Sequence, residues 1–107
     1  MPKLRGLTLV VVSGDPERFR AALTIACAHA VQGERTRFYC HEGAVALLRP
    51  GDHERDTLFR MARECGVEFI ACQTGLAMAD MAMPAGVEPG GLVGIFAELS
   101  DDRLVTV

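Results

Sequence analysis

The chain has 107 residues, half of them apolar, and a formal net charge of −3. This length is typical of a single domain, and the charge excludes the basic surface that binds nucleic acids or acidic membranes. No apolar run approaches the ~20 residues of a membrane-spanning helix, and the apolar run after the N-terminus is too short for a signal peptide. We therefore expect a cytoplasmic protein.

The apolar content and the cysteines bear on assembly and redox state. A chain this short buries only part of its apolar content in its own core, so we expect a homo-oligomer. The four cysteines are Cys27, Cys40, Cys65 and Cys72, and they include no CxxC pair. Neither a zinc site nor a thioredoxin-type dithiol is predicted, and we expect free thiols and no metal or organic cofactor.

The first strand and helix are predicted from a continuous apolar run and a capping signal. Residues 7–12 are aliphatic or β-branched, which is typical of a strand covered on both faces. Asp15 is a candidate N-cap for a helix over residues 16–32 that ends at a glycine. Cys27 belongs to the apolar face of this helix and is interpreted as a packing residue. His29 lies off that face, so we expect a side chain exposed to solvent or to a partner.

The second strand, Thr36–Cys40, ends at a possible Cys–His pair. A short helix over residues 44–48 is predicted to follow it. If the strand is parallel to its neighbours, Cys40 and His41 open at the same edge of the sheet as Cys72. A cysteine and a histidine in contact can act as nucleophile and base. Neighbouring residues of a strand point to opposite faces, so we expect at most one of the two at a site.

The next helix is predicted to start in the polar stretch of residues 52–56, with acidic residues in its first turn, and to end at Gly66. His53 is expected in an exposed loop and has no assigned role. Four apolar residues of this helix recur at spacings of three and four, which indicates a core-facing stripe. They are Leu58, Met61, Ala62 and Cys65. Cys65 is thus interpreted as a second packing cysteine.

Cys72 is the candidate for the chemistry. It follows a strand over residues 67–71, and Gln73, Thr74 and Gly75 then open a helix. Ligand sites of open α/β sheets lie at the carboxyl ends of the strands. The free N–H groups of the helix would lower the pKa of a thiol there and favour the nucleophilic thiolate. The alternative is a small apolar side chain that fills the end of a strand.

The remaining residues complete the sheet. Met78, Met81 and Met83 are interpreted as core or interface residues rather than metal ligands. Residues 84–91 are predicted to be an irregular connection, either a flap over Cys72 or a plain turn. A final helix is expected to present an apolar face, formed by Leu92, Ile95, Phe96 and Leu99, and residues 103–107 supply a closing strand.

The alternation of strands and helices predicts an α/β fold with a mostly parallel sheet and helices on both faces. Four strands are recognised from the residue pattern. The dinucleotide, phosphate-loop, nucleophile-elbow and zinc-protease motifs GxGxxG, GxxxxGK[ST], GxSxG and HExxH are absent from the sequence.

Several pieces, in one order across nearly all residues, resemble the DsrE/DsrF-like family of sulfur-relay proteins. They are an apolar strand leading into Ser13-Gly14-Asp15-Pro16-Glu17-Arg18, an alanine-rich helix, the strand Thr36–Cys40, Gly43-Ala44-Val45-Ala46-Leu47-Leu48, Ile70-Ala71-Cys72-Gln73-Thr74-Gly75, and Val87-Glu88-Pro89-Gly90-Gly91-Leu92-Val93 before a helix and a terminal strand. The resemblance implies a single three-layer α/β/α domain with a mostly parallel five-stranded sheet, assembled into dimers, trimers or hexamers.

The resemblance also implies that Cys72 carries a persulfide between a donor and an acceptor protein. A partly exposed thiolate at a helix start suits that role, with Thr74 and the N–H groups of Thr74 and Gly75 stabilising the anion. Two alternatives stay open. One is a non-catalytic binding or assembly module, and the other is a thiol redox sensor in which Cys40 resolves an oxidised Cys72.

Overall fold

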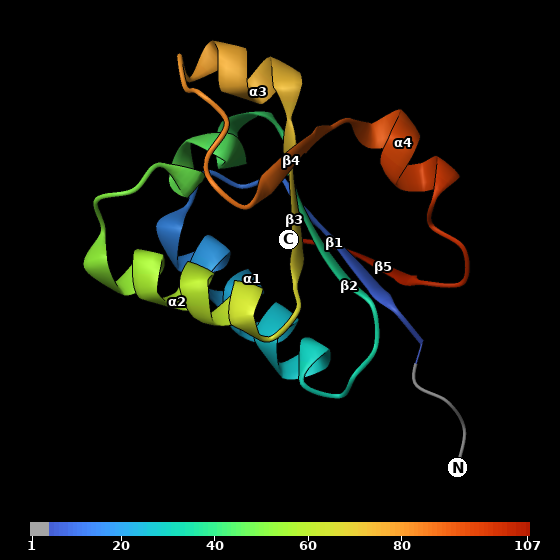
Figure 1. Cartoon of the computed structure of the whole chain (residues 1–107). Helices are drawn as coiled ribbons and strands as arrows, with labels where there is room; N and C mark the ends of the chain where they lie inside the picture. Colours follow the sequence, from blue (N-terminus) through green and yellow to red (C-terminus); the bar gives the residue numbers. More distant parts are fainter. Residues whose placement is uncertain (1–4) are drawn as a thin grey trace.

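Five parallel strands form one sheet at the centre of the computed structural model, which describes residues 5–107 (Figure 1). Their spatial order is β4-β3-β2-β1-β5. Along the chain the elements are β1 (Leu7–Val11), α1 (Pro16–Ala30), β2 (Thr36–Cys40), the 3-10 helix η1 (Glu42–Leu48), α2 (His53–Glu64), β3 (Glu68–Cys72), α3 (Gln73–Met78), β4 (Val87–Gly90), α4 (Leu92–Ala97) and β5 (Arg103–Thr106). The predicted α/β class with a parallel sheet is confirmed.

The first long helix begins at the predicted cap, and the second is also capped by an aspartate. The carboxylate of Asp15 accepts a hydrogen bond from the N–H of Glu17, and Asp52 caps α2 by accepting from the N–H of Arg55. Helix α1 ends at Ala30, two residues before the predicted end. The chain turns there toward Gly33, whose φ of 87° is a left-handed conformation that glycine adopts readily.

The connection at residues 84–91 differs from its prediction. Instead of a flap or a plain turn, Val87–Gly90 forms β4, an edge strand paired with β3. Pro89 is tolerated because an edge strand leaves one side of its backbone without a partner strand. The segment after β2 also differs, since it forms the 3-10 helix Glu42–Leu48 and starts earlier than the helix predicted over residues 44–48.

The two faces of the sheet are covered by different helices (Figure 1). Phe38 of β2 packs edge-to-face against Phe19 of α1, with ring centroids 5.3 Å apart, and Phe59 of α2 packs against Phe69 of β3 at 4.5 Å. Arg37 precedes Phe38 and therefore points to the opposite face, where its guanidinium contacts α4. Helices α1 and α2 thus lie on one face, and the much shorter α4 lies on the other.

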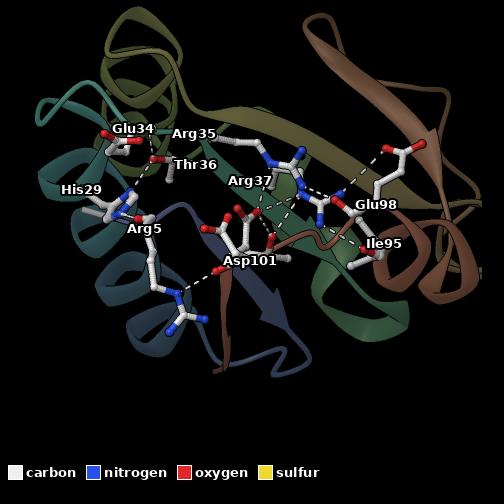
Figure 2. Close-up of polar contacts among 11 residues, drawn as sticks. Arg5, His29, Glu34, Arg35, Thr36, Arg37, Ile95, Glu98 and Asp101 are labelled. Atoms are coloured by element: carbon white, nitrogen blue, oxygen red, sulfur yellow. Dashed lines mark hydrogen bonds and ion pairs between the residues drawn. The ribbon is translucent and has the colours of Figure 1, made fainter. Parts of the chain in front are cut away.

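A buried charged cluster ties α4 and the start of β5 to the central strands, and we call it the Asp102 cluster (Figure 2). The Asp102 carboxylate accepts hydrogen bonds from the Thr8 hydroxyl at 2.9 Å and from Arg35 Nε at 3.0 Å. Arg37 Nε lies 3.8 Å from the same carboxylate, and Arg37 Nη2 donates to the carbonyl of Ile95 at 3.0 Å. Burial lowers the pKa of Arg37 and the neighbouring Arg35 lowers it further, while Asp102 opposes both effects.

Two details of the apolar surface and one histidine depart from the prediction. Phe96 of the predicted face of the last helix is 49% exposed, while Ile95 is buried, and Met61 of the predicted core-facing stripe is also 49% exposed. His29 is partly buried, and its ring nitrogens lie 2.7 Å from the Thr36 hydroxyl and 2.9 Å from the carbonyl oxygen of Arg5 (Figure 2). His29 therefore holds α1 to the strands instead of pointing freely into solvent. Within residues 5–107, no helix has the length and apolar character needed to cross a membrane.

Candidate functional site

Cys72 lies where β3 becomes α3, as predicted. It is the last residue of the strand and the N-cap of the helix, and its sulfur accepts a hydrogen bond from the N–H of Gly75 at 3.4 Å. The residue is only 6% exposed, so the expectation of a partly exposed thiol is wrong. Packing of η1 against α3 covers this end of the sheet.

Four donors from three parts of the chain converge on the Cys72 sulfur, and we call them the thiolate cradle. They are the backbone N–H groups of Glu42, Gly75 and Thr74 and the hydroxyl of Tyr39. Burial raises the pKa of the Cys72 thiol, but the four hydrogen bonds together outweigh that effect, so the pKa lies below its usual value. The donors belong to η1, α3 and β2, so the site does not depend on the short α3 alone.

Glu42 contributes its N–H from an unfavourable backbone conformation. Its φ is 43°, in the left-handed region that residues other than glycine, asparagine and aspartate rarely adopt. The turn at Glu42 starts η1 and points its N–H toward Cys72. Backbone strain of this kind costs about 1–3 kcal/mol and persists where the surrounding structure enforces it, commonly at functional sites.

Gly75 allows α3 to approach η1 closely. A Cβ atom at this position would lie 2.6 Å from Cγ2 of Val45 and 2.7 Å from the carbonyl oxygen of Glu42. No side chain fits there without a shift of one helix. The absence of a side chain at Gly75 is thus what lets the N–H groups of Glu42 and Gly75 reach one sulfur atom.

We expect Gly75→Ala to raise the pKa of Cys72 toward its usual value. The added methyl group forces α3 away from η1, which separates two of the four donors and destabilises the fold by about 1–3 kcal/mol. The pH dependence of alkylation at Cys72, read by peptide mass mapping, measures the effect. Gly43→Ala is the matched control, because a Cβ atom at Gly43 meets nothing within 4 Å. Equal pH profiles for the two variants would contradict the role of the close approach.

A chain of polar side chains extends from the sulfur toward solvent. The Tyr39 hydroxyl, which contacts Cys72, lies 3.1 Å from Nδ1 of His41, and Nε2 of His41 lies 3.4 Å from the Glu42 carboxylate. A hydroxyl has one proton to donate. When the Tyr39 hydroxyl donates to the sulfur, its oxygen must therefore accept the hydrogen bond from Nδ1–H of His41. The chain links the buried sulfur to the partly exposed imidazole.

The structure brings some of the other predicted site residues to Cys72 and places others away from it. His41 joins the site through Tyr39, whereas Cys40 is fully buried on the opposite face of the sheet, and burial raises the pKa of its thiol. Gln73 and Thr74 have exposed side chains, and Thr74 contributes its backbone N–H. The structure does not bring Cys40 to Cys72 as a resolving thiol.

Tyr39 was not among the predicted site residues. Tyr39 is opposite Ile70 in the β2–β3 register, and Ile70 shares a face with Cys72. Tyr39 and His41 also share a face of the chain, since they are two residues apart. The alternation of side chains along the strand was thus the signal that could have placed Tyr39 on the same face as Cys72. The left-handed turn at Glu42 had no signal in the sequence.

Within residues 5–107, no cluster of three or more His, Cys, Asp or Glu side chains is arranged to hold a metal ion. A scan against models of known protein families finds no match for this chain. A search of curated proteins also finds no significant match.

Proposed function

We propose that this chain is a sulfur-relay protein of the DsrE/DsrF-like type, in which Cys72 carries sulfane sulfur as a persulfide. The observation that carries the proposal is the thiolate cradle. The donors lower the pKa of the Cys72 thiol, which increases the fraction present as thiolate, the nucleophilic form that accepts sulfur. The sheet order and the helix on each face fit the three-layer sandwich that the resemblance implies.

The proposed transfer has two displacement steps. The Cys72 thiolate attacks the outer sulfur of a donor persulfide, R–S–SH, forming Cys72–S–SH and releasing the donor as R–S⁻. An acceptor thiolate then attacks the outer sulfur of Cys72–S–SH, takes that sulfur, and restores the Cys72 thiolate. No electrons are gained or lost overall. The cradle stabilises the anion that is present before loading and again after delivery.

The second candidate is a non-catalytic assembly module, and exposed apolar side chains favour it. Val93 and Phe96 on α4 are at least 40% exposed, and so is Leu104 on β5, whose side chain points to the same face of the sheet as α4. Such side chains suit a subunit interface. We propose that the protein forms a homo-oligomer through this side of the sheet in either case, since a relay protein can assemble as well.

We expect one added sulfur atom, about 32 Da, on Cys72 after treatment with a small sulfane donor. The increment is measured on the intact protein and located by peptide mapping, and it should disappear in Cys72→Ser. Cys40→Ser should retain it, because the buried Cys40 does not contact the donor. An increment that survives in Cys72→Ser would defeat the relay assignment. A wild-type chain that takes up no sulfur and whose Cys72 is alkylated only after unfolding would favour the assembly module.

A further inference from the structure

The two edges of the sheet differ in how they are protected (Figure 1). At one edge, β4 presents the exposed residues Glu88 and Pro89, a charge and a residue without an N–H group. Charged side chains and prolines are the features by which natural sheet edges avoid pairing with another chain. At the other edge, β5 carries one charge, Arg103 at its start, and no proline, and all four of its residues are exposed. The edge at β5 is therefore open to a further strand.

The backbone of β5 leaves two residues unpaired on its outer side. Arg103 and Val107 donate their N–H groups to carbonyl oxygens on the β1 side, at 2.8 and 2.9 Å respectively. Because successive residues of a strand face alternate sides, Val105 also directs its backbone groups to β1. Leu104 and Thr106 direct their N–H and C=O groups away from β1. These groups have no backbone partner among the described residues, 5–107.

We propose that β5 pairs antiparallel with β5 of a second copy of this chain, about a two-fold axis at Val105. This inference rests on the homo-oligomer proposed above and specifies the contact that forms it. In this register Leu104 of each copy lies opposite Thr106 of the other, and each such pair exchanges both N–H···O=C hydrogen bonds. Every outward backbone group of these two residues then has a partner.

The side chains of β5 fit the same register. Val105 lies opposite its own copy on the face of α1 and α2, while Leu104 lies opposite Thr106 on the face of α4. Leu104 is 43% and Val105 40% exposed, so pairing covers apolar surface that a single copy leaves in water. The two Arg103 residues are separated by roughly 13 Å along the strands, so like charges are not placed opposite each other.

A two-fold pair fits this edge better than a head-to-tail contact between copies. Pairing of β5 with β4 of a further copy would form an open-ended chain, and Pro89 lacks an N–H group for that ladder. The two-fold pair uses both open edges and leaves the two protected β4 edges outside. In the joined sheet the two Cys72 residues lie roughly 30 Å apart, so each would load sulfur alone.

Disulfide trapping tests the register in a Cys72→Ser background, which removes the candidate reactive thiol. Val105→Cys places two cysteines opposite each other with Cα atoms about 4.5 Å apart, within the range of a disulfide. Leu104→Cys is the matched control, because it is similarly exposed but its two copies lie on a diagonal, about 7–8 Å apart and beyond that range. We expect oxidised glutathione to link Val105→Cys into a dimer, with two peptides of residues 104–107 joined after trypsin, and to leave Leu104→Cys unlinked.

Thr106→Pro tests the hydrogen bonds between copies. Proline removes an outward N–H group and leaves the pairing with β1 intact, so the fold should persist. The dissociation constant of the dimer should rise about tenfold or more, because each copy loses a hydrogen bond to the other. Thr106→Val, which keeps the N–H group, is the control. Sedimentation measures the association, and circular dichroism checks the fold.

Equal cross-linking of Leu104→Cys and Val105→Cys, or equal association of Thr106→Pro and Thr106→Val, would overturn the β5 pairing and leave the homo-oligomer standing. A wild-type chain that stays monomeric even at millimolar concentration would overturn both. Thr106→Pro should take up sulfur at Cys72 as the wild type does, because β5 is remote from the candidate site. Sulfur loading therefore tests the relay separately from the pairing.

Discussion

Asp102→Ala should lower the free energy of unfolding by about 3–5 kcal/mol, the largest change in stability that we expect from one substitution. Asp102 is 6% exposed and holds Thr8 and Arg35 by hydrogen bonds, with Arg37 at ion-pair distance. Removing the carboxylate leaves the 5% exposed Arg37 without its main buried counter-charge. Because this cluster joins α4 and β5 to β1 and β2, the loss should loosen that whole side of the sheet. Urea unfolding followed by circular dichroism measures the change.

Asp101→Ala is the matched control. Asp101 is the preceding acidic residue, but its side chain is exposed and its backbone carbonyl makes the contact with Arg5 (Figure 2). A surface substitution of this kind changes stability by about 0.5 kcal/mol or less. If Asp102→Ala and Asp101→Ala unfold at the same urea concentration, the buried cluster contributes nothing measurable and our account of α4 docking is wrong.

Tyr39→Phe should raise the pKa of Cys72 and slow its alkylation at neutral pH about tenfold. A hydrogen bond to a charged group contributes about 1.5–3 kcal/mol, and 1.4 kcal/mol corresponds to one pKa unit. Phenylalanine keeps the buried ring and removes only the hydroxyl that contacts the sulfur. The rate should recover when the pH exceeds the new pKa, because the thiolate is then fully formed in both proteins.

His41→Asn separates the direct effect of the hydroxyl from that of the chain beyond it. Tyr39 keeps its contact with the sulfur in this variant and loses only the imidazole, so the pKa of Cys72 should change less than in Tyr39→Phe. Circular dichroism serves as the control that both variants are folded. The same pH profile for wild type and Tyr39→Phe would show that the Tyr39 hydroxyl does not stabilise the thiolate.

Four strands of the sheet could be predicted because each is a short apolar or β-branched run bounded by turn residues. Strand β4 could not, since Val87–Gly90 contains a proline and a glycine and only its first residue is buried. Its pairing with β3 depends on tertiary packing and not on its own propensity. The Asp102 cluster could not be predicted either. Thr8 and Asp102 are far apart in the sequence, and they come into contact only because β5 pairs with β1.

For the candidate site, the position of Cys72 followed from local rules, whereas its surroundings did not. A strand followed by a helix places the thiol among free N–H groups, and this required only neighbouring residues. The N–H of Glu42 and the hydroxyl of Tyr39 come from β2 and η1, so they required the strand register and a rare turn. The low exposure of the thiol arises from the contact of α3 with η1 that Gly75 permits.

The depth of Cys72 makes loading and delivery unequal under the proposed function. A sulfur atom bonded to Sγ extends the side chain by about 2 Å, so a loaded chain offers reagents an outer atom that the empty chain lacks. An incoming donor must reach a residue that is 6% exposed, whereas an acceptor attacks the outer sulfur. Under the proposed function we therefore expect uptake to be slower than delivery, and we expect the buried thiolate to be protected from bulky oxidants.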